Sequence, residues 1–352
     1  MFGGLFMNIC ALIMAGGKGT RFWPLSTEEK PKQFLNLVGD KTMIQMTVDR
    51  ILPIIPIERI FVCTGEKYIE LVKEQLPNLP DRNIIVEPEG RNTAPCITLS
   101  AIVMERYYNG ATMVVLPSDH LIENKDEFRN TIIKGYKFLE NNQNGIVTLG
   151  MKPDRPETGY GYISYGNDVE SGIKEVNEFV EKPNLELAQK YLEEGTYLWN
   201  GGMFIWKVEH ILSEIKKYVP ATYEALHNLI NINEEDMQKF IDKNYRNTDA
   251  ISIDYAVLEK SEKIFVIPSE IGWDDIGTWK SVERYREKDV NNNILSDGVK
   301  AIESQSNMVV RNDKKIVMLG VEDILAIETD DTIYIVNKGY MDNLRNYQNQ
   351  IS

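Results

Sequence analysis

Short apolar runs alternate with helical patterns through the first half of the chain. The runs are apolar at almost every position, which is typical of strands buried on both faces of a parallel sheet. They occupy residues 8–14, 59–63, 83–86, 112–116 and 146–149. The segments between them place apolar residues three or four positions apart, as helices do, at residues 43–51, 66–76, 92–108 and 125–139. This alternation predicts a mixed, mostly parallel sheet with helices on both faces.

The second half of the chain departs from this pattern. Residues 151–182 alternate apolar and polar positions between turns, which predicts a β-rich insertion before a helix at 184–194. "WNGGMFIWK" (199–207) predicts a glycine turn that leads into a strand. After residue 291, short apolar runs begin at 309, 316, 324 and 333, which predicts a small cap resembling a short β-helix. We therefore expect an α/β domain over residues 1–288 and a C-terminal β-rich cap over residues 289–352.

Composition narrows the range of partners. The chain has 352 residues and a formal net charge of −14, and a protein this acidic offers no general basic face to nucleic acid. No apolar run approaches the roughly 20 residues that a membrane helix needs, so no membrane association is expected. Residues 1–6 are too short for a signal sequence. Cys10, Cys63 and Cys96 have no CxxC spacing, which predicts buried thiols in a reducing, cytoplasmic setting.

The first predicted strand ends in a glycine-rich loop that carries two cations. In "ALIMAGGKGTRFWPLS" (11–26), Gly16, Gly17 and Gly19 surround a lysine, and Arg21 follows. The loop lacks the GxxxxGK[ST] spacing of a P-loop and the third glycine of the GxGxxG dinucleotide fingerprint. Glycines still let backbone amides approach a polyphosphate closely, and the cations neutralise its charge. In an acidic protein this pattern favours a small anionic ligand over a solvated surface loop.

Two aspartates follow predicted strands. Asp119 in "VLPSDH" comes just after an apolar run, and Asp275 in "GWDDIGTW" lies in a glycine-flanked turn. Separate carboxylates that also meet phosphate oxygens suit Mg²⁺. On these residues alone, a helix cap or a turn is the stronger interpretation of each. We expect a structural role for the neighbouring Asp274.

Eight blocks along the chain resemble, in order, one enzyme family. "AGGKGTRFWPLSTEEKPKQF" resembles the signature of the sugar-nucleotide pyrophosphorylases, and "FWPLS…KPKQF" within it resembles their mannose-1-phosphate guanylyltransferase branch. The later blocks are "EPEGRNTAP", "VLPSDH", "RPETGYGYI", "FVEKP", "WNGGMF", "SIDYAV" and "WDDIGTW", as far as Trp279. The resemblance implies a Rossmann-like nucleotidyltransferase domain of the GT-A-like kind, and it makes Asp119 and Asp275 the expected metal ligands for Mg²⁺.

The resemblance also implies a reaction and roles for residues in most of the blocks. GMP would pass from GTP to α-D-mannose 1-phosphate by in-line attack, without a covalent intermediate, giving GDP-mannose and pyrophosphate. Arg21, Lys32 and Lys182 would be the catalytic cations. Nucleotide-binding roles fall on Ala15, Gly16, Gly17, Gly19, Thr20, Arg21, Asn92, Thr93 and Ser118. Sugar-phosphate roles fall on Gly161, Glu181, Lys182 and Asn200.

Several alternatives stay open from the sequence. Residues 87–93 and Ser118 lie on loops where a base could bind. Among them, Asn92, Thr93 and Ser118 have suitable groups, and they suit a helix cap and a turn equally well. The chain could use another sugar phosphate or nucleotide, or it could be a non-catalytic regulatory subunit that binds GDP-mannose. The presence of Arg21, Lys182 and the two aspartates Asp119 and Asp275 favours an enzyme. The cap could mediate a homodimer or only cover an edge of the main domain. The isomerase domain that some members of the family carry is not expected here.

Overall fold

The computed structural model describes residues 7–310 and 314–351. Contacts within it group the chain into two compact units. The first contains the described residues up to Gly17 together with Thr47–Trp273, and the second contains Lys18–Met46 and the described residues from Asp274 onward. The predicted domain boundary between residues 288 and 289 stays a prediction. Positions 1–6, 311–313 and 352 of the predicted domains lie outside the described residues.

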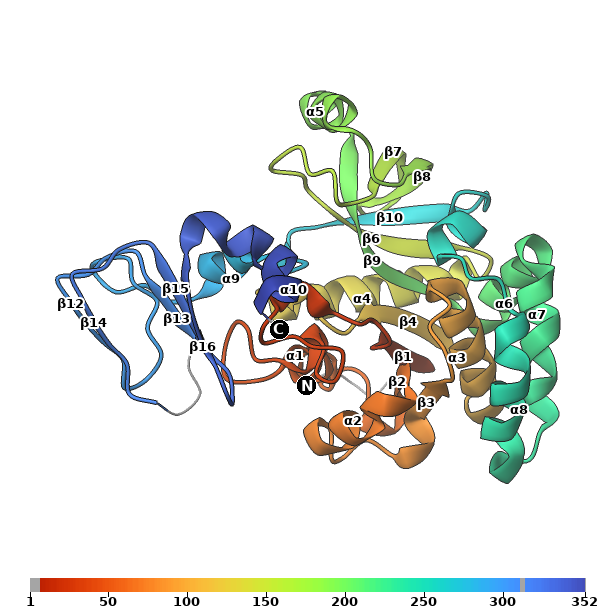
Figure 1. The fold of residues 1–352 in the computed structure, drawn as a ribbon. Helices are drawn as coiled ribbons and strands as arrows, with labels where there is room; N and C mark the ends of the chain where they lie inside the picture. The colour runs from red at the N-terminus through yellow and green to blue at the C-terminus, as the bar shows by residue number, and fades with distance from the viewer. Residues whose placement is uncertain (1–6, 311–313, 352) are drawn as a thin grey trace. The chain divides into compact units, whose positions relative to one another are not determined.

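A mixed sheet forms the centre of the first unit (Figure 1). Its strand order is β3-β2-β1-β4-β9-β6-β10-β8-β7. The pairs β1–β2, β1–β4, β2–β3 and β6–β10 are parallel, whereas β9 runs antiparallel to β4, β6 and β7, and β8 runs antiparallel to β7 and β10. The strands are β1 (Ile9–Met14), β2 (Ile60–Gly65), β3 (Ile84–Glu87), β4 (Thr112–Pro117), β6 (Ile146–Met151), β7 (Tyr162–Glu170), β8 (Ile173–Val180), β9 (Tyr197–Lys207) and β10 (Ile264–Ser269). The expected mixed α/β sheet is confirmed.

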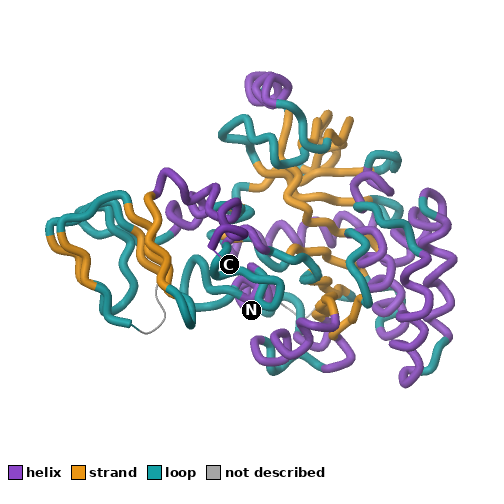
Figure 2. Tube along the Cα trace, in the orientation of Figure 1, coloured by secondary structure: helices purple, strands orange, loops and turns teal. Residues whose placement is uncertain are grey.

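Helices cover both faces of this sheet, as Figure 2 shows by colour. Phe204 and Trp206 of β9 belong to the buried cluster that includes α3 (Thr93–Tyr107). Ile205, between them, faces the other way, because a Cβ added to Gly135 of α4 (Lys125–Asn141) would lie 2.6 Å from its Cδ1. Neighbouring residues of a strand point to opposite faces, so α3 and α4 lie on opposite sides of the sheet. The missing side chain at Gly135 lets α4 approach the strand closely.

Two further helices of the first unit match predicted helical patterns, α2 (Ile69–Gln75) and α5 (Leu185–Glu194). The other helices of this unit are α6 (Val208–Tyr218), α7 (Pro220–Leu226) and α8 (Met237–Asn244). The helix α1 (Met43–Ile51) and the two-residue strand β11 (Trp273–Asp274) cross the border between the units, and β5 is Leu121–Ile122. Among the described residues, no helix has both the length and the apolar character that crossing a membrane requires.

The strand β9 differs from its prediction. We expected Gly201 and Gly202 to form a turn that leads into a strand, but β9 runs through both glycines without a break. The register between β6 and β9 shifts between Thr148 and Gly150, and Gly202 has a φ of +64°. An irregularity of this kind bends a strand without ending it, and glycine tolerates the backbone conformation that it requires. The single strand thus reaches both the core and the β7–β8 insertion.

Short strands stack in the second unit, as the predicted β-cap requires. The strands are β12 (Lys300–Ile302), β13 (Met308–Val310), β14 (Val317–Leu319), β15 (Ile324–Glu328) and β16 (Ile333–Asn337), followed by the 3-10 helix Lys338–Tyr347 and α10 (Gln348–Ile351). The pairs β12–β14 and β13–β15 are parallel, and β16 closes the second sheet antiparallel to β15. Val309, Met318 and Ala326 form a small buried cluster between them. The side chain of Asn307 donates to the carbonyl of Val321 at 2.9 Å and accepts from the amide of Ile324 at 3.0 Å, so polar contacts also link successive turns of the stack.

Candidate functional site

The glycine loop begins at the carboxyl end of β1. In the first unit β1 lies between β2 and β4, and ligands of such sheets lie in the crevice outside the strand ends. The amide of Ala15 donates to the carbonyl of Cys63 at 2.8 Å, and the amide of Ser118 donates to the carbonyl of Met14 at 3.2 Å. These bonds bring Ala15 and Ser118 to one edge of the sheet, where Gly16 is exposed.

A buried carboxylate lies next to this loop. Glu87 ends β3 and is 6% exposed, and a Cβ added to Gly16 would lie 2.7 Å from its Oε2. The hydroxyl of Tyr245 donates to its Oε1. Burial raises the pKa of Glu87, and the hydrogen bonds from Tyr245 and Cys63 act in the opposite direction. The sequence placed Glu87 within the stretch 87–93, where a base could lie, but it gave this residue no role of its own.

The three residues proposed for the base have structural contacts. The Oδ1 of Asn92 accepts from the amide of Thr93 at 2.9 Å, which caps α3, and Asn92 has a φ of +70°. The hydroxyl of Thr93 accepts from the amide of Ile253 at 2.8 Å. Ser118 is buried, and its carbonyl accepts from the hydroxyl of Thr47 at 3.2 Å. The cap and turn roles are therefore present, and a role at the base stays a prediction.

Two side chains of α1 hold the loop that carries Asp119. Besides the bond from Thr47, the Nη2 of Arg50 donates to the carbonyl of His120 at 2.9 Å. Arg50 is 3% exposed, and burial lowers its pKa to about 9. Both neighbours of Asp119 are thus fixed to one helix. Its own side chain is partly buried.

All four sugar-phosphate candidates lie together in the first unit. A Cβ added to Gly161 would lie 2.5 Å from the Oε2 of Glu181 and 3.7 Å from the Nδ2 of Asn200. The ammonium group of Lys182 lies 2.8 Å from the Oε1 of Glu181, and the lysine side chain is 61% exposed. This ion pair is the main cause of the raised pKa of Lys182. Lys182 has a φ of +47°, a conformation that costs a residue with a side chain about 1–3 kcal/mol.

A second acid that the sequence analysis missed completes this cluster. The Nδ2 of Asn200 donates to the Oδ1 of Asp254 at 2.8 Å, and the Oδ1 of Asn200 accepts from the amide of Gly202 at 3.0 Å. Asp254 begins the π-helical turn Asp254–Leu258, a type of turn frequent at functional sites. Burial, and then the nearby Glu181, raise the pKa of Asp254 to about 6. Its signal in the sequence was the block "SIDYAV", to which no role had been assigned.

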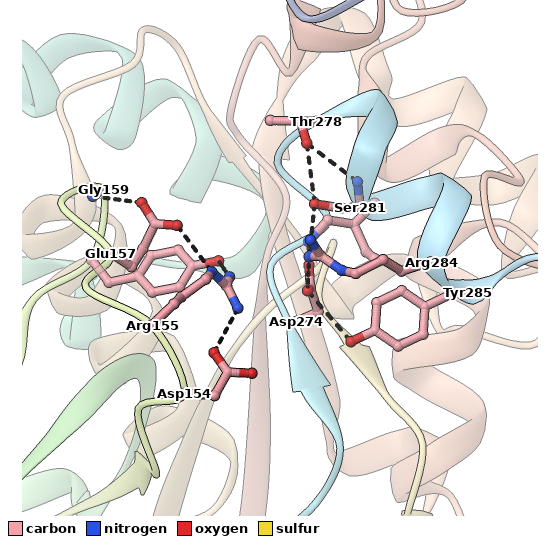
Figure 3. Close-up of polar contacts among 11 residues, drawn as sticks. Asp154, Arg155, Glu157, Gly159, Asp274, Thr278, Ser281, Arg284 and Tyr285 are labelled. Atoms are coloured by element: carbon pink, nitrogen blue, oxygen red, sulfur yellow. Dashed lines mark hydrogen bonds and ion pairs between the residues drawn. The ribbon is translucent and has the colours of Figure 1, made fainter. Parts of the chain in front are cut away.

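The loop before Gly161 is closed by its own ion pairs. Arg155 lies 2.9 Å from Asp154, and Glu157 accepts from the amide of Gly159 at 3.0 Å (Figure 3). The guanidinium carbon of Arg155 lies 4.9 Å from the ring centroid of Trp199. These contacts order the chain immediately before Gly161.

The second unit gathers the other candidates around a tight turn. Gly19 has a φ of +45°, and its carbonyl accepts from the amide of Lys32 at 3.2 Å. The ammonium group of buried Lys32 donates to the carbonyl of Asp275. A Cβ added to Gly277 would lie 3.0 Å from the Oδ2 of Asp275 and 3.4 Å from the Nη1 of Arg21. Thr20, beside Arg21, opens the 3-10 turn Thr20–Phe22. Thus Arg21, Lys32 and the Asp275 carboxylate lie close together.

Asp274 has the structural role that was expected. Its Oδ2 accepts from Arg284 at 2.5 Å and from the hydroxyl of Tyr285 at 3.4 Å, and its Oδ1 accepts from the amide of Ile276 at 2.7 Å (Figure 3). The side chain is 4% exposed. It therefore fixes the turn from which Asp275 projects.

The carboxylates of Asp119 and Asp275 are the candidate ligands for a metal. Carboxylate oxygens are the donors that Mg²⁺ prefers, and this ion is typically held by one or two carboxylates together with substrate phosphates. The space left by Gly277 lies directly against the Asp275 carboxylate. Each carboxylate by itself offers the oxygen donors that a hard divalent cation takes, and a metal site formed by the two stays a prediction.

Comparison with known proteins identifies the class. Residues 10–292 match the family of nucleotidyl transferases, and the chain belongs to that family. It is 36% identical over 345 residues to a protein of Escherichia coli named mannose-1-phosphate guanylyltransferase, covering 95% of this chain and 74% of that protein. A protein of the same name from Klebsiella pneumoniae is 37% identical over 335 residues, covering 93% of this chain and 70% of the relative.

A solved structure extends the similarity to the fold. The structure described as mannose-1-phosphate geranyltransferase from Thermus thermophilus matches with a TM-score of 0.86 at 30% identity, covering 98% of this chain and 99% of that one. The α/β fold with C-terminal β-strands is confirmed by this match. The resemblance drawn from the sequence blocks is confirmed, and so is the expectation that the chain is a nucleotidyltransferase enzyme.

The raised pKa of Asp254 predicts a pH-dependent stability. A carboxyl whose pKa is higher in the folded than in the unfolded protein loses folding free energy as the pH rises from about 4 to about 6. Asp254→Asn cannot ionise there, and its side-chain oxygen can still accept from Asn200. We expect the free energy of unfolding of this variant, relative to the parent, to rise by roughly 2–3 kcal/mol between pH 4 and pH 7. Urea unfolding at a series of pH values measures it.

The matched control is Asp242→Asn, because Asp242 is exposed on α8 of the same unit. The difference between this variant and the parent should stay flat across the same pH series. A flat difference for Asp254→Asn as well would show that the Asp254 carboxyl is not held in an unfavourable environment.

Proposed function

We propose that the chain transfers GMP from GTP to α-D-mannose 1-phosphate, releasing pyrophosphate and giving GDP-mannose. The observation that carries this proposal is the presence in the first unit of two groups of candidate residues. A glycine loop with a buried carboxylate lies at one strand edge, and a cluster of Glu181, Lys182 and Asn200 surrounds Gly161. The names of the relatives that cover most of the chain agree with it.

Positioning and charge neutralisation suffice for this reaction. The attacking oxygen belongs to a phosphate that is already an anion, so no protein base and no covalent intermediate are needed. Arg21, Lys32 and the amides of the glycine loop neutralise the triphosphate and the leaving pyrophosphate. Lys182 holds the attacking phosphate in line with the α-phosphorus. Each such contact counts because it strengthens as charge moves toward the leaving group.

The groups around Gly161 bind the sugar. Gly161 leaves room for the Glu181 carboxylate to lie against the backbone, and this carboxylate accepts from sugar hydroxyls. Asn200 offers its remaining amide hydrogen, since Asp254 and Gly202 fix the other positions of its amide. Asp254 is thus a positioning residue for Asn200.

We propose Mg²⁺ as the cofactor, with Asp119 and Asp275 as its protein ligands. When bound, the ion neutralises phosphate charge during the transfer. A cytoplasmic homodimer is also part of the proposal. The three cysteines are free and buried, which agrees with a reducing compartment.

Selection of guanine is assigned to Glu87. Guanine presents two hydrogen-bond donors on neighbouring atoms of its Watson–Crick edge, N1–H and N2–H, and an ionised carboxylate only accepts. The Oε1 of Glu87 is occupied by the Tyr245 hydroxyl, and the Oε2 lies beside Gly16. Bases that present an acceptor at the position of N1–H meet a carboxylate lone pair instead, so this arrangement favours GTP over ATP.

The reaction itself is tested by pyrophosphate release. Purified protein with Mg²⁺, GTP and mannose 1-phosphate should release pyrophosphate, and omission of either substrate should stop it. ATP, UTP and CTP, and glucose 1-phosphate in place of the mannose compound, should be poorer by at least tenfold in kcat/KM, the effect of about 1.4 kcal/mol. Tight binding of GDP-mannose without any pyrophosphate release would instead favour the non-catalytic regulatory subunit.

Glu87→Gln tests the assignment of the base. The glutamine oxygen stays with the Tyr245 hydroxyl, which turns the NH₂ group toward the two donors of guanine. We expect kcat/KM for GTP to fall by roughly 5- to 150-fold, which corresponds to about 1–3 kcal/mol, while the preference over ATP shrinks. Glu89→Gln is the control, because exposed Glu89 in the same loop pairs only with Arg91 in the described contacts. An equal loss for GTP and ATP would remove Glu87 from base selection.

Gly161→Ala tests the sugar cluster. The added Cβ would meet the Oε2 of Glu181 at 2.5 Å and displace this carboxylate. Losing a hydrogen bond to a charged group costs about 1.5–3 kcal/mol, so KM for mannose 1-phosphate should rise roughly 10- to 150-fold while KM for GTP changes little. Gly159→Ala is the control, since its Cβ would meet only the movable end of Glu157 at 3.3 Å. Equal effects on both substrates would mean a general loss of structure.

A further inference from the structure

Two buried thiols lie behind the glycine loop, next to Glu87. Cys63 is 0% exposed on β2, and Cys96 is 5% exposed on α3. One sulfur from each and one carboxylate oxygen of Glu87 all lie within 4.8 Å of one another. The proposed reaction uses neither thiol. Two of the three donors, the thiols, therefore have no role in the proposed nucleotidyl transfer.

The three donors come from separate parts of the chain and are held by further polar groups. Cys63 is hydrogen-bonded to the Glu87 carboxylate and to Cys96, and Ser100 also contacts it. The Tyr245 hydroxyl reaches Glu87 from another side of the cluster. Around them lies the apolar cluster of the sheet and α3. Polar groups converging on one point in an apolar interior are typical of a ligand site.

The geometry is close to that of a metal centre. Tetrahedral Zn²⁺ has metal–sulfur bonds of about 2.3 Å, which places neighbouring donors roughly 3.7 Å apart. Donors that already lie within 4.8 Å of one another need to close by about 1 Å at most. Sulfur ligands select soft or borderline cations, whereas Mg²⁺ takes oxygen. The cluster therefore discriminates against the ion proposed for catalysis.

We propose that Cys63, Cys96 and Glu87 form a site for one thiophilic divalent cation, Zn²⁺ or Cd²⁺, and that the bound cation blocks the base position. Each thiol loses its proton to solvent as its sulfur binds the cation, so one cation replaces two protons and no electron transfer is involved. The carboxylate of Glu87 becomes a ligand and is no longer free to accept from guanine. This consequence, unlike the site itself, rests on the proposed function.

Cadmium is the probe that reports directly on the site. The cadmium–thiolate bond has its own ultraviolet absorption, so binding is seen without an activity assay. We expect one Cd²⁺ per chain in the parent protein and in Cys10→Ser. Cys63→Ser and Cys96→Ser should bind at least tenfold more weakly. Cys10 is a matched control because it is buried in the same sheet, with Arg59 as its neighbour at 3.9 Å from Nη1 to sulfur.

Thiol protection tests the same site without any variant, in case a serine substitution prevents folding. Cadmium should shield Cys63 and Cys96 from alkylation, and leave the rate at Cys10 unchanged, when modified peptides are quantified by mass spectrometry. Absence of the thiolate absorption at one equivalent of Cd²⁺, or equal protection of all three cysteines from alkylation, would overturn the proposal of a cation site.

Guanosine separates the site from its proposed effect, since it carries the base without phosphates that chelate the cation. Guanosine should weaken Cd²⁺ binding, and adenosine should not. Cadmium binding that guanosine leaves unchanged would retain the metal site and overturn the block of the base position.

Discussion

The candidate residues of each unit depend on a close approach of carboxylates to backbone that carries no side chain. Glu87 lies against Gly16, Glu181 lies against Gly161, and Asp275 lies against Gly277; a Cβ at these glycines would lie 2.7, 2.5 and 3.0 Å from the nearest carboxylate oxygen. Contacts below about 3 Å do not occur for real Cβ atoms. A side chain at any of the three positions would move an acid that the proposed reaction needs. The glycines therefore matter for the space they leave beside an acid as well as for their conformation.

Electrostatics sets the second condition, because this acidic chain must bind anionic substrates. The acids near the proposed ligands are each matched by a donor: Tyr245 donates to Glu87, Lys182 pairs with Glu181, and Asn200 donates to Asp254. Unmatched, these buried or half-buried carboxylates would repel phosphate and take up protons. In the proposed function the cations Arg21, Lys32 and Lys182 act on the phosphates, and Lys182 does so while it also pairs with Glu181. Part of the loop geometry, such as the bond from Lys32 to the Asp275 carbonyl, keeps a cation in place before substrate arrives.

Local pattern was enough to predict the sheet, but not the acids that matter most in the site. Runs of apolar residues identified β1 and β4, and Asn92 was expected to cap α3, because these signals lie within a few neighbouring residues. Glu87 and Asp254 carry no such signal. Each is an ordinary acid in the sequence, and its burial depends on a partner far along the chain, such as Tyr245 for Glu87. Similarly, the strand through Gly201 and Gly202 depends on its pairing with β6, which two glycines in isolation do not indicate.

The grouping of Gly161, Glu181, Lys182 and Asn200 was predicted from the resemblance to a family, and not from the spacing of these residues along the chain. Glu181 and Asn200 are separated by a helix, so no local rule brings them to the same glycine. The roles proposed for these residues stay predictions, although the structure brings Gly161, Glu181, Lys182 and Asn200 together.

Burial of Glu87 explains both the proposed selection of guanine and the proposed binding of a thiophilic cation beside it. A carboxylate discriminates between hydrogen-bond donors best when water does not compete for it, which requires that the carboxylate be buried. The groups that bury Glu87 include Cys63 and Tyr245. Small side chains of moderate polarity serve that purpose in a core, and cysteine is one of them. Two cysteines beside a carboxylate also constitute a donor set for a soft cation, whereas the proposed magnesium ligands offer oxygen alone. The two proposed cation sites therefore differ in donor type, oxygen for Mg²⁺ and sulfur for the thiophilic cation. The cysteines that help to enclose Glu87 also make this acid part of a site for the thiophilic cation.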